Sequence, residues 1–210
     1  MGMHQKVRVG MPTPWGRADQ AVEMCEGIGA VATPSHGGIL LSDERQAAMP
    51  SYLRHEDGWY EEDCEWCKPF VVFSDDLIAA AEERWDKATI RACSTVEGAG
   101  DHGTARETLR AWYPDLYEEH FGVKLKPGQS HTRDRQVFYT EHAADLVVVS
   151  AIGSGDKCPD GMVLVSATVG GVRLGLSGAR RFLVPSSEYS GRECRIGFVV
   201  DPARHEEVAA

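Results

Sequence analysis

The chain has 210 residues, of which 42% are hydrophobic and 26% charged, and its formal net charge at pH 7 is −10. This length can bury a sizeable globular core, and no apolar run approaches the roughly 20 residues that span a membrane. Residues 1–16 lack the apolar core of a secretory signal. We therefore expect a cytoplasmic protein without membrane contact, whose six cysteines are free thiols.

The first half of the chain predicts a hairpin followed by helices. Residues 1–12 are expected to be a leader, and β-prone runs at residues 27–33 and 39–41 predict a hairpin around a Gly-bearing loop. Ser42 is predicted to cap a short helix that ends before Pro50. A short strand is expected at residues 70–73. Ser74 is then predicted to cap the longest helix, to about Cys93, with a buried stripe made of Leu77, Ile78, Ala81, Trp85, Ala88 and Ala92.

A Gly-rich linker at residues 97–103 leads into three further predicted helices. The first covers residues 104–112, Pro114 opens the second, which ends at Gly122, and Ser130 caps the third, which extends to about His142. Each start carries a residue type that favours the first turn of a helix.

The hydrophobic pattern changes after residue 145, where β-branched and apolar runs alternate with Gly, Pro, Asp and Ser. This pattern predicts an antiparallel meander with a two-residue turn at Gly170 and Gly171. Its strands are expected at residues 146–152, 162–169, 172–176, 182–184 and 196–200. Residues 203–210 are expected to be a loose tail. The predicted fold class is α+β, with an N-terminal β-hairpin, central helices and a C-terminal antiparallel sheet, in a single domain over residues 13–202.

Residues 33–67 hold the densest set of chemically restricted residues, in the run TPSHGGILLSDERQAAMPSYLRHEDGWYEEDCEWC. His36 precedes a Gly-Gly pair, which allows either a close approach of another backbone or a positive φ in the loop. The WYEED run at residues 59–63 supplies aromatic rings to line a junction and acids to orient an imidazole. We therefore predict that His36 lies close to residues 59–63.

Two chemical interpretations of this stretch stay open beside a purely structural one. In the first, Cys64 and Cys67 hold a metal ion whose coordination His36, His55 or an acid completes, whereas the structural alternative has both thiols filling core space. In the second, His36 is a general base of a metal-dependent hydrolase centred on residues 61–63; its acids are Glu61, Glu62 and Asp63. The run matches no catalytic signature, so we assign no catalytic residue and expect no cofactor, with zinc or another divalent metal as the alternative.

Negative charge is concentrated in residues 56–86, where eleven acidic and two basic residues give a local net charge of −9. Such a surface repels nucleic acid and attracts basic proteins, so direct nucleic-acid binding is not expected. The alternative is a solvated helix face. The predicted binding residues are Glu61, Glu62, Asp63, Glu65, Asp75, Asp76, Glu82, Glu83 and Asp86.

Several motifs together resemble one proteobacterial domain family of unknown function, found on plasmids, integrative elements and prophages. They are TPWG, TPSHGGI, WYEED, WYPD, FLVP with a following EY, and GFVVDP, and the resemblance extends from Thr13 to Pro202. It implies mobile-element biology beside anti-defence genes, and no assigned activity or catalytic residue. We expect a non-catalytic anti-CRISPR or anti-restriction inhibitor, which binds a basic protein or nucleoprotein complex of a host defence through the acidic face.

Overall fold

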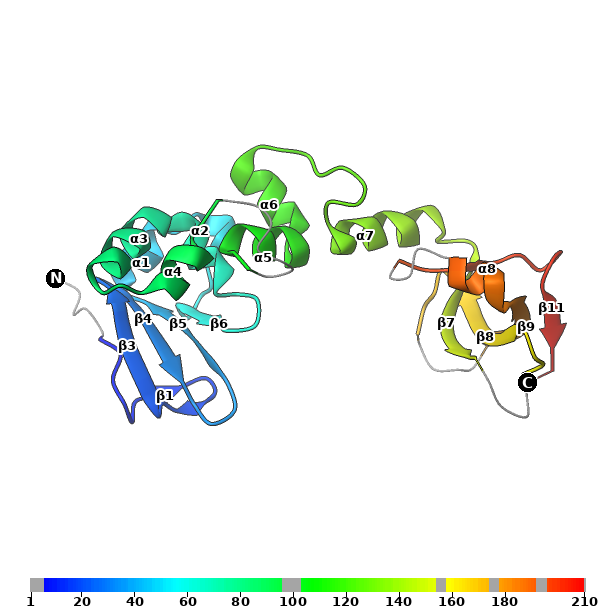
Figure 1. The fold of residues 1–210 in the computed structure, drawn as a ribbon, viewed down its shortest axis with the longest axis horizontal. Coiled ribbons are helices and arrows are strands. Elements are labelled where there is room, and N and C mark those ends of the chain that lie inside the picture. Colours follow the sequence, from blue (N-terminus) through cyan, green and yellow to red (C-terminus); the bar gives the residue numbers. More distant parts are fainter. Residues whose placement is uncertain (1–5, 96–102, 154–157, 174–177, 192–195, 210) are drawn as a thin grey trace. The chain divides into compact units, whose positions relative to one another are not determined.

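The computed structural model describes residues 6–95, 103–153, 158–173, 178–191 and 196–209. The chain divides into two compact units, Met1–Leu125 and Lys126–Ala210 (Figure 1). Each unit has its own hydrophobic core. The α+β fold class is confirmed, with antiparallel strands first, helices next and an antiparallel sheet last. The single domain expected over residues 13–202 spans both units and stays a prediction.

The first unit is built on a four-stranded antiparallel sheet in the order β3-β4-β5-β6. Its strands are β3 (Gln20–Cys25), β4 (Ile28–Ala32), β5 (Gly37–Leu41) and β6 (Trp59–Glu61). A separate two-stranded ribbon pairs β1 (Pro12–Thr13) with β2 (Gly16–Arg17). The predicted hairpin is β4 and β5, and in the register of the next pair Gly38 lies opposite Glu61. This pairing brings the WYEED run beside the loop that carries His36.

Helices cover one face of this sheet (Figure 1). They are α1 (Asp43–Ala48), the 3₁₀ turn η1 (Ser51–Leu53), α2 (Cys67–Val72), α3 (Ser74–Glu83), α4 (Lys87–Ala92), α5 (Ala105–Trp112) and α6 (Pro114–Phe121). Alternate strand residues such as Ile39, Leu41 and Tyr60 pack against the helical layer, where Leu77 and Leu109 are fully buried. Side chains alternate between the two faces of a strand, so the intervening residues belong to a second core.

The second core of this unit lies on the opposite face of the sheet. Val31 and Leu40 pack there with Met11 and Ala18 from the N-terminal segment. Met11 is only 5% exposed and Val7 packs against the same cluster, so the segment expected to be a leader contributes to this core. Residues 1–5 of that leader lie outside the described residues.

Two of the three predicted helix caps, at Ser42 and Ser130, are present, and Thr104 adds a cap at the start of α5. The cap predicted at Ser74 is wrong, because Ser74 is the first residue of α3, Phe73 holds the N-cap position, and no described side chain caps this helix. The side chain of Ser42 accepts from the backbone N–H of Arg45, and Thr104 forms a capping box with Glu107. Ser130 caps α7 (His131–Glu141) in the second unit. These bonds satisfy backbone donors that the first turn of a helix leaves unpaired.

Two predicted elements between residues 70 and 93 are wrong. Residues 70–73 belong to α2 and its C-cap rather than to a strand, because Pro69 lies in the first turn of a helix that packs against α5. The long helix from Ser74 is broken into α3 and α4 at Trp85, which has a left-handed φ of 58° and is 84% exposed. Trp85 and Ala88 are exposed and do not join the predicted buried stripe, whereas Ala92 in α4 is half-buried and packs against the same core as Leu77.

The second unit holds α7 and a five-stranded antiparallel sheet in the order β10-β7-β8-β9-β11. Its strands are β7 (Leu146–Ile152), β8 (Met162–Val169), β9 (Arg180–Pro185), β10 (Val199–Val200) and β11 (Glu206–Val208), and a short helix α8 (Ser186–Gly191) follows β9. The predicted antiparallel meander is therefore present in β7, β8 and β9. The strand predicted at residues 172–176 is wrong in its described part, because Val172 and Arg173 lie outside any strand and β8 pairs with β9 instead. Gly170 and Gly171 form a turn, but it does not join β8 to a strand that starts at residue 172. Residues 174–176 of the predicted strand at 172–176, and residues 97–102 of the predicted linker, lie outside the described residues.

The tail expected to be loose contains strand β11. Glu206, Glu207 and Val208 pair with β9, and the carboxylate of Glu207 accepts two hydrogen bonds from Arg180. Strand β9 thus supplies backbone hydrogen-bond partners for the tail, and the polar composition of the tail did not indicate this pairing. Among the described residues, no helix has the length and apolar character required to cross a membrane.

Candidate metal site

His36 lies in the turn between β4 and β5, which Thr33 closes by hydrogen bonding. Its hydroxyl donates to the His36 carbonyl at 2.7 Å and accepts from the His36 N–H at 3.1 Å, while the Thr33 N–H donates to the same carbonyl. The His36 side chain is 54% exposed. The backbone at His36 is therefore fixed while its ring faces solvent.

The Gly-Gly pair after His36 permits two close approaches. A Cβ at Gly38 would lie 2.5 Å from the carbonyl oxygen of Tyr60 and 2.3 Å from the ring of Trp15. A Cβ at Gly37 would lie 2.5 Å from Oε2 of Glu62. The predicted reason for the Gly-Gly pair is thus confirmed in one of its forms, because the two glycines make room for β6 and the residues that follow it.

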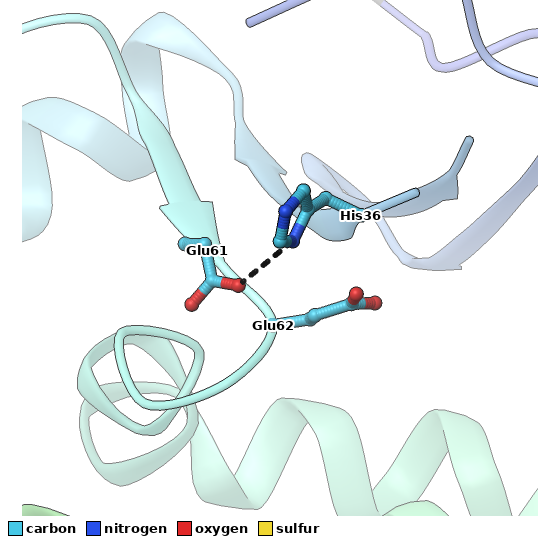
Figure 2. A group of neighbouring side chains, drawn as sticks. All are labelled: His36, Glu61 and Glu62. Atoms are coloured by element: carbon cyan, nitrogen blue, oxygen red, sulfur yellow. Dashed lines mark ion pairs between the residues drawn. The ribbon is translucent and has the colours of Figure 1, made fainter. Parts of the chain in front are cut away.

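The Glu61 carboxylate faces the His36 ring from the end of β6, and the side chain of Glu62 extends beside the ring (Figure 2). His36 Nδ1 lies 3.8 Å from Glu61 Oε1, and one ligand atom from each of the three residues lies within 4.8 Å of the others. Glu61 Oε2 accepts from the backbone N–H of Asp63 at 2.7 Å. Glu61 Oε1 is buried, and no hydrogen-bond donor among the described residues reaches it.

One imidazole and two carboxylates are a ligand set for zinc or manganese. Bonds of about 2.0–2.2 Å to a shared ion would hold neighbouring ligand atoms about 3.0–3.5 Å apart, so the cluster must contract slightly to bind one. His36 and Glu62 are exposed side chains that can make this movement. Three protein ligands also leave a coordination position for water, as catalytic zinc sites do.

The structure separates the predicted site residues into three groups. His36, Glu61 and Glu62 come together, and the predicted proximity of His36 to residues 59–63 is confirmed. Asp63 contributes only its backbone N–H to Glu61. Cys64 and Cys67 do not belong to the group of possible metal ligands found among the described residues.

A second polar cluster, which the sequence did not reveal, adjoins the first. Glu65 Oε1 lies 2.7 Å from His55 Nε2 and 3.2 Å from Lys68 Nζ, and the Lys68 side chain is only 7% exposed. Lys68 Nζ also lies 3.2 Å from His55 Nε2, and it donates to this ring nitrogen in the tautomer that leaves Nε2 without a proton. Glu65 Oε2 also accepts from the Glu61 N–H at 3.4 Å, so the cluster supports the end of β6.

The two cysteines of the Cys-x-x-Cys motif differ in environment. Cys64 is half-buried and its Sγ lies 3.1 Å from the hydroxyl of Tyr113, whereas Cys67 is fully buried in the core. Burial raises the pKa of the Cys67 thiol far above its usual value. It also raises the pKa of Tyr113, with a further contribution from the Cys64 hydrogen bond, so this phenol stays protonated.

The predicted acidic face is only partly available to a partner. Glu65 pairs with Lys68, Asp76 pairs with Arg45, and Asp86 caps α4 through Thr89. Hydrogen bonds from Thr89 lower the pKa of Asp86 below its usual value. The predicted residues that are exposed are Glu62, Asp63, Asp75, Asp76, Glu82 and Glu83.

Comparison with known proteins identifies the family. Residues 8–143 match a family model described as "Domain of unknown function (DUF7007)", and the chain belongs to that family. The matched region includes the first unit from residue 8 and extends to the end of α7, so the strands of the second unit follow it. No curated protein matched the chain. No solved structure matched it either.

Proposed function

We propose that the first unit binds one divalent metal ion through His36, Glu61 and Glu62 and acts as a metal-dependent hydrolase. The observation that carries the proposal is the convergence of their three ligand atoms within 4.8 Å. The buried Glu61 Oε1 supports it, because a cation would supply the partner that this oxygen lacks among the described residues. When bound, the metal supplies Lewis-acid chemistry and an acidified water.

The exposure of His36 distinguishes this proposal from a structural role. A histidine that only locks the hairpin onto the core should be buried and hydrogen-bonded at both ring nitrogens. The side chain of His36 is 54% exposed and its Nδ1 faces Glu61. A ring in this position can bind a metal ion or exchange a proton with a bound substrate.

Calorimetric titration of the purified chain with Zn²⁺ and Mn²⁺ tests the proposal. We expect one ion per chain, and at least a tenfold weaker affinity for His36→Ala, Glu61→Gln or Glu62→Gln. Asp63→Asn is the matched control, since it removes a neighbouring exposed carboxylate outside the cluster. Chromogenic carboxylate and phosphate esters then report hydrolysis, which a chelator should abolish. Binding that is absent, or equal in all variants, would contradict the proposal.

A second candidate function is favoured by the surface of α3. Asp75 and Glu82 are seven residues apart, as are Asp76 and Glu83, and all four are exposed. Seven residues are almost two full helical turns, so the four acids share one solvent-facing stripe. The family resemblance adds the proteobacterial and mobile-element setting. We propose on this basis that the stripe binds a basic defence complex in the cytoplasm, as an anti-CRISPR or anti-restriction inhibitor.

Capture of purified CRISPR and restriction complexes at low and high salt tests this second function. Glu82→Lys with Glu83→Lys should abolish a capture that is strong at low salt. The matched control is Glu141→Lys with Asp160→Lys, which makes the same change in charge at exposed acids of the second unit. Equal capture by both double variants would exclude the α3 stripe as the binding surface.

A further inference from the structure

Trp85 is the most exposed large hydrophobic residue among those that the structure describes. Its exposed fraction is 84%, and with a φ of 58° it is also the one residue other than glycine that has a positive φ in the described parts of the chain. This backbone conformation is unfavourable for a residue with a Cβ. Burial of the ring does not offset the cost, because the ring faces solvent. An exposed ring on an unfavourable backbone points to a role outside folding.

Hydrogen bonds on both sides of Trp85 fix the backbone from which its ring projects. The end of α3 is a Schellman motif, in which the Trp85 N–H donates to the Glu82 carbonyl at 3.2 Å and the Asp86 N–H donates to the Ala81 carbonyl at 2.9 Å. Glycine is the usual residue at the position that Trp85 holds in this motif. On the other side of the turn, the Asp86 side chain accepts from the Thr89 N–H and caps α4.

The surface beside this turn is acidic. Glu82 and Glu83 are exposed in the last turn of α3, and the C-terminal end of the helix adds partial negative charge. Arg84 and Lys87 are exposed cations on either side of the ring. Residues 56–86 together nevertheless carry a net charge of −9, so this face attracts a cationic partner.

We infer that Trp85 anchors an arginine-bearing basic segment of a protein partner, with a guanidinium of that segment stacked on the indole. The face of an indole attracts a cation, and the planar guanidinium stacks on it better than an ammonium does. Glu82 and Glu83 supply negative charge beside the ring. Glu83 also lines a surface groove, together with Glu26 and Arg84, in which the rest of the segment can lie.

This inference builds on the second proposed function, in which the acidic stripe of α3 binds a basic partner. It adds the residue that anchors the partner and the type of side chain that this residue contacts. The proposed metal site is not involved.

Fluorescence anisotropy of a labelled peptide of alternating arginine and glycine residues tests the inference with the full-length chain. Trp85→Ala should weaken binding of this peptide at least about threefold at low salt, and Trp85→Phe should retain part of the affinity. Trp112→Ala is the matched control, because it removes another exposed indole, which is 51% exposed at the end of α5. A peptide with lysine in place of arginine should depend less on Trp85.

Trp85→Gly separates loss of binding from loss of fold. This variant should bind the arginine peptide as weakly as Trp85→Ala, while its urea midpoint rises because the left-handed backbone is relieved. Equal binding by the unaltered chain, Trp85→Ala and Trp112→Ala would overturn the inference. A dimer of the unaltered chain that Trp85→Ala dissociates in sedimentation would also overturn it, since the ring would then contact a second copy.

Two further outcomes separate this inference from the second proposed function. Capture of a defence complex that is equal for Trp85→Ala and the unaltered chain would overturn the inference and leave the acidic stripe as the binding surface. Binding of the arginine peptide that depends on Trp85, without capture of any defence complex, would support the inference and contradict the second proposed function.

Discussion

Gly37→Ala is the most informative single substitution, because it perturbs the contact between the His36 turn and Glu62. A Cβ at this buried position would lie 2.5 Å from Glu62 Oε2 and 2.7 Å from the carbonyl oxygen of Val31. The Val31 carbonyl belongs to β4, which is paired on both sides, so it cannot withdraw without opening the sheet. Overpacking of this kind lowers the free energy of unfolding by about 1–3 kcal/mol.

The same substitution should weaken metal binding, because the Glu62 carboxylate must move away from the new methyl group. We expect at least about a tenfold loss of zinc affinity, which corresponds to about 1.4 kcal/mol. Urea denaturation monitored by circular dichroism measures the free energy of unfolding, and calorimetric titration measures the zinc affinity. Gly153→Ala is the matched control, since no described atom lies within 4 Å of its Cβ.

Two outcomes would refute the reasoning. If Gly37→Ala is as stable as Gly153→Ala, the close approach of Gly37 to Glu62 and Val31 does not exist. If Gly37→Ala is destabilised but binds zinc with unchanged affinity, the approach is real and Glu62 is not a metal ligand.

Three further predictions concern the helical layer of the first unit. Trp85→Gly should raise the free energy of unfolding by about 0.5–1 kcal/mol in urea denaturation, because it relieves the left-handed backbone of an exposed residue; a destabilised variant would contradict this. Asp86→Ala should lower the free energy of unfolding by about 1 kcal/mol, because the Asp86 side chain no longer accepts from the Thr89 N–H. Asp86→Asn should keep most of this capping contribution, since an amide oxygen can accept the same bond. Because the folded pKa of Asp86 is lowered, its contribution should be present above the unfolded pKa and lost as pH falls through the folded pKa, so the Asp86→Ala effect should vanish in acid. Leu109→Ala, at a fully buried position, should cost about 2–5 kcal/mol in the same assay, and a loss below about 1 kcal/mol would contradict the assigned core.

The parts of the fold that were predictable depend on short-range signals. Ser42 and Ser130 act as the predicted helix caps because their side chains reach backbone donors within three residues, whereas Ser74, also predicted as a cap, is the first residue of α3. The β4–β5 hairpin followed from two apolar runs around a Gly-bearing loop. Strand β6 was missed because its three residues are too few for a periodic pattern, and its place depends on pairing with β5.

The errors arose where tertiary contacts override a local pattern. The apolar residues 70–73 fit a strand or a helix equally well, and packing of α2 against α5 selects the helix. The apolar spacing after Ser74 continued through Trp85, although Asp86 and Thr89 already formed a second cap signal. An Asp followed three residues later by Thr89 is a helix-start pattern, and it could have predicted that a new helix begins after Asp86.

The candidate site was predictable in outline and not in its full composition. The Gly-Gly pair next to His36 indicated a close approach, and the WYEED run was the nearest acidic and aromatic partner. The 49-residue separation between Cys64 and Tyr113 carries no sequence signal, since their contact depends on how α5 and α6 pack. The Glu65–Lys68 pair had the spacing of helical neighbours, and its link to His55 required the folded chain.

The most direct test of the central claim is the position of a bound metal ion. A crystal of the full-length chain soaked in Mn²⁺ should give one anomalous peak about 2.0–2.3 Å from His36 Nδ1 and from oxygens of Glu61 and Glu62. The peak should be absent from Glu61→Gln crystals grown and soaked in the same way. A soaked crystal without a peak at these residues, or with its peak at Cys64 and Cys67, would contradict the proposed site.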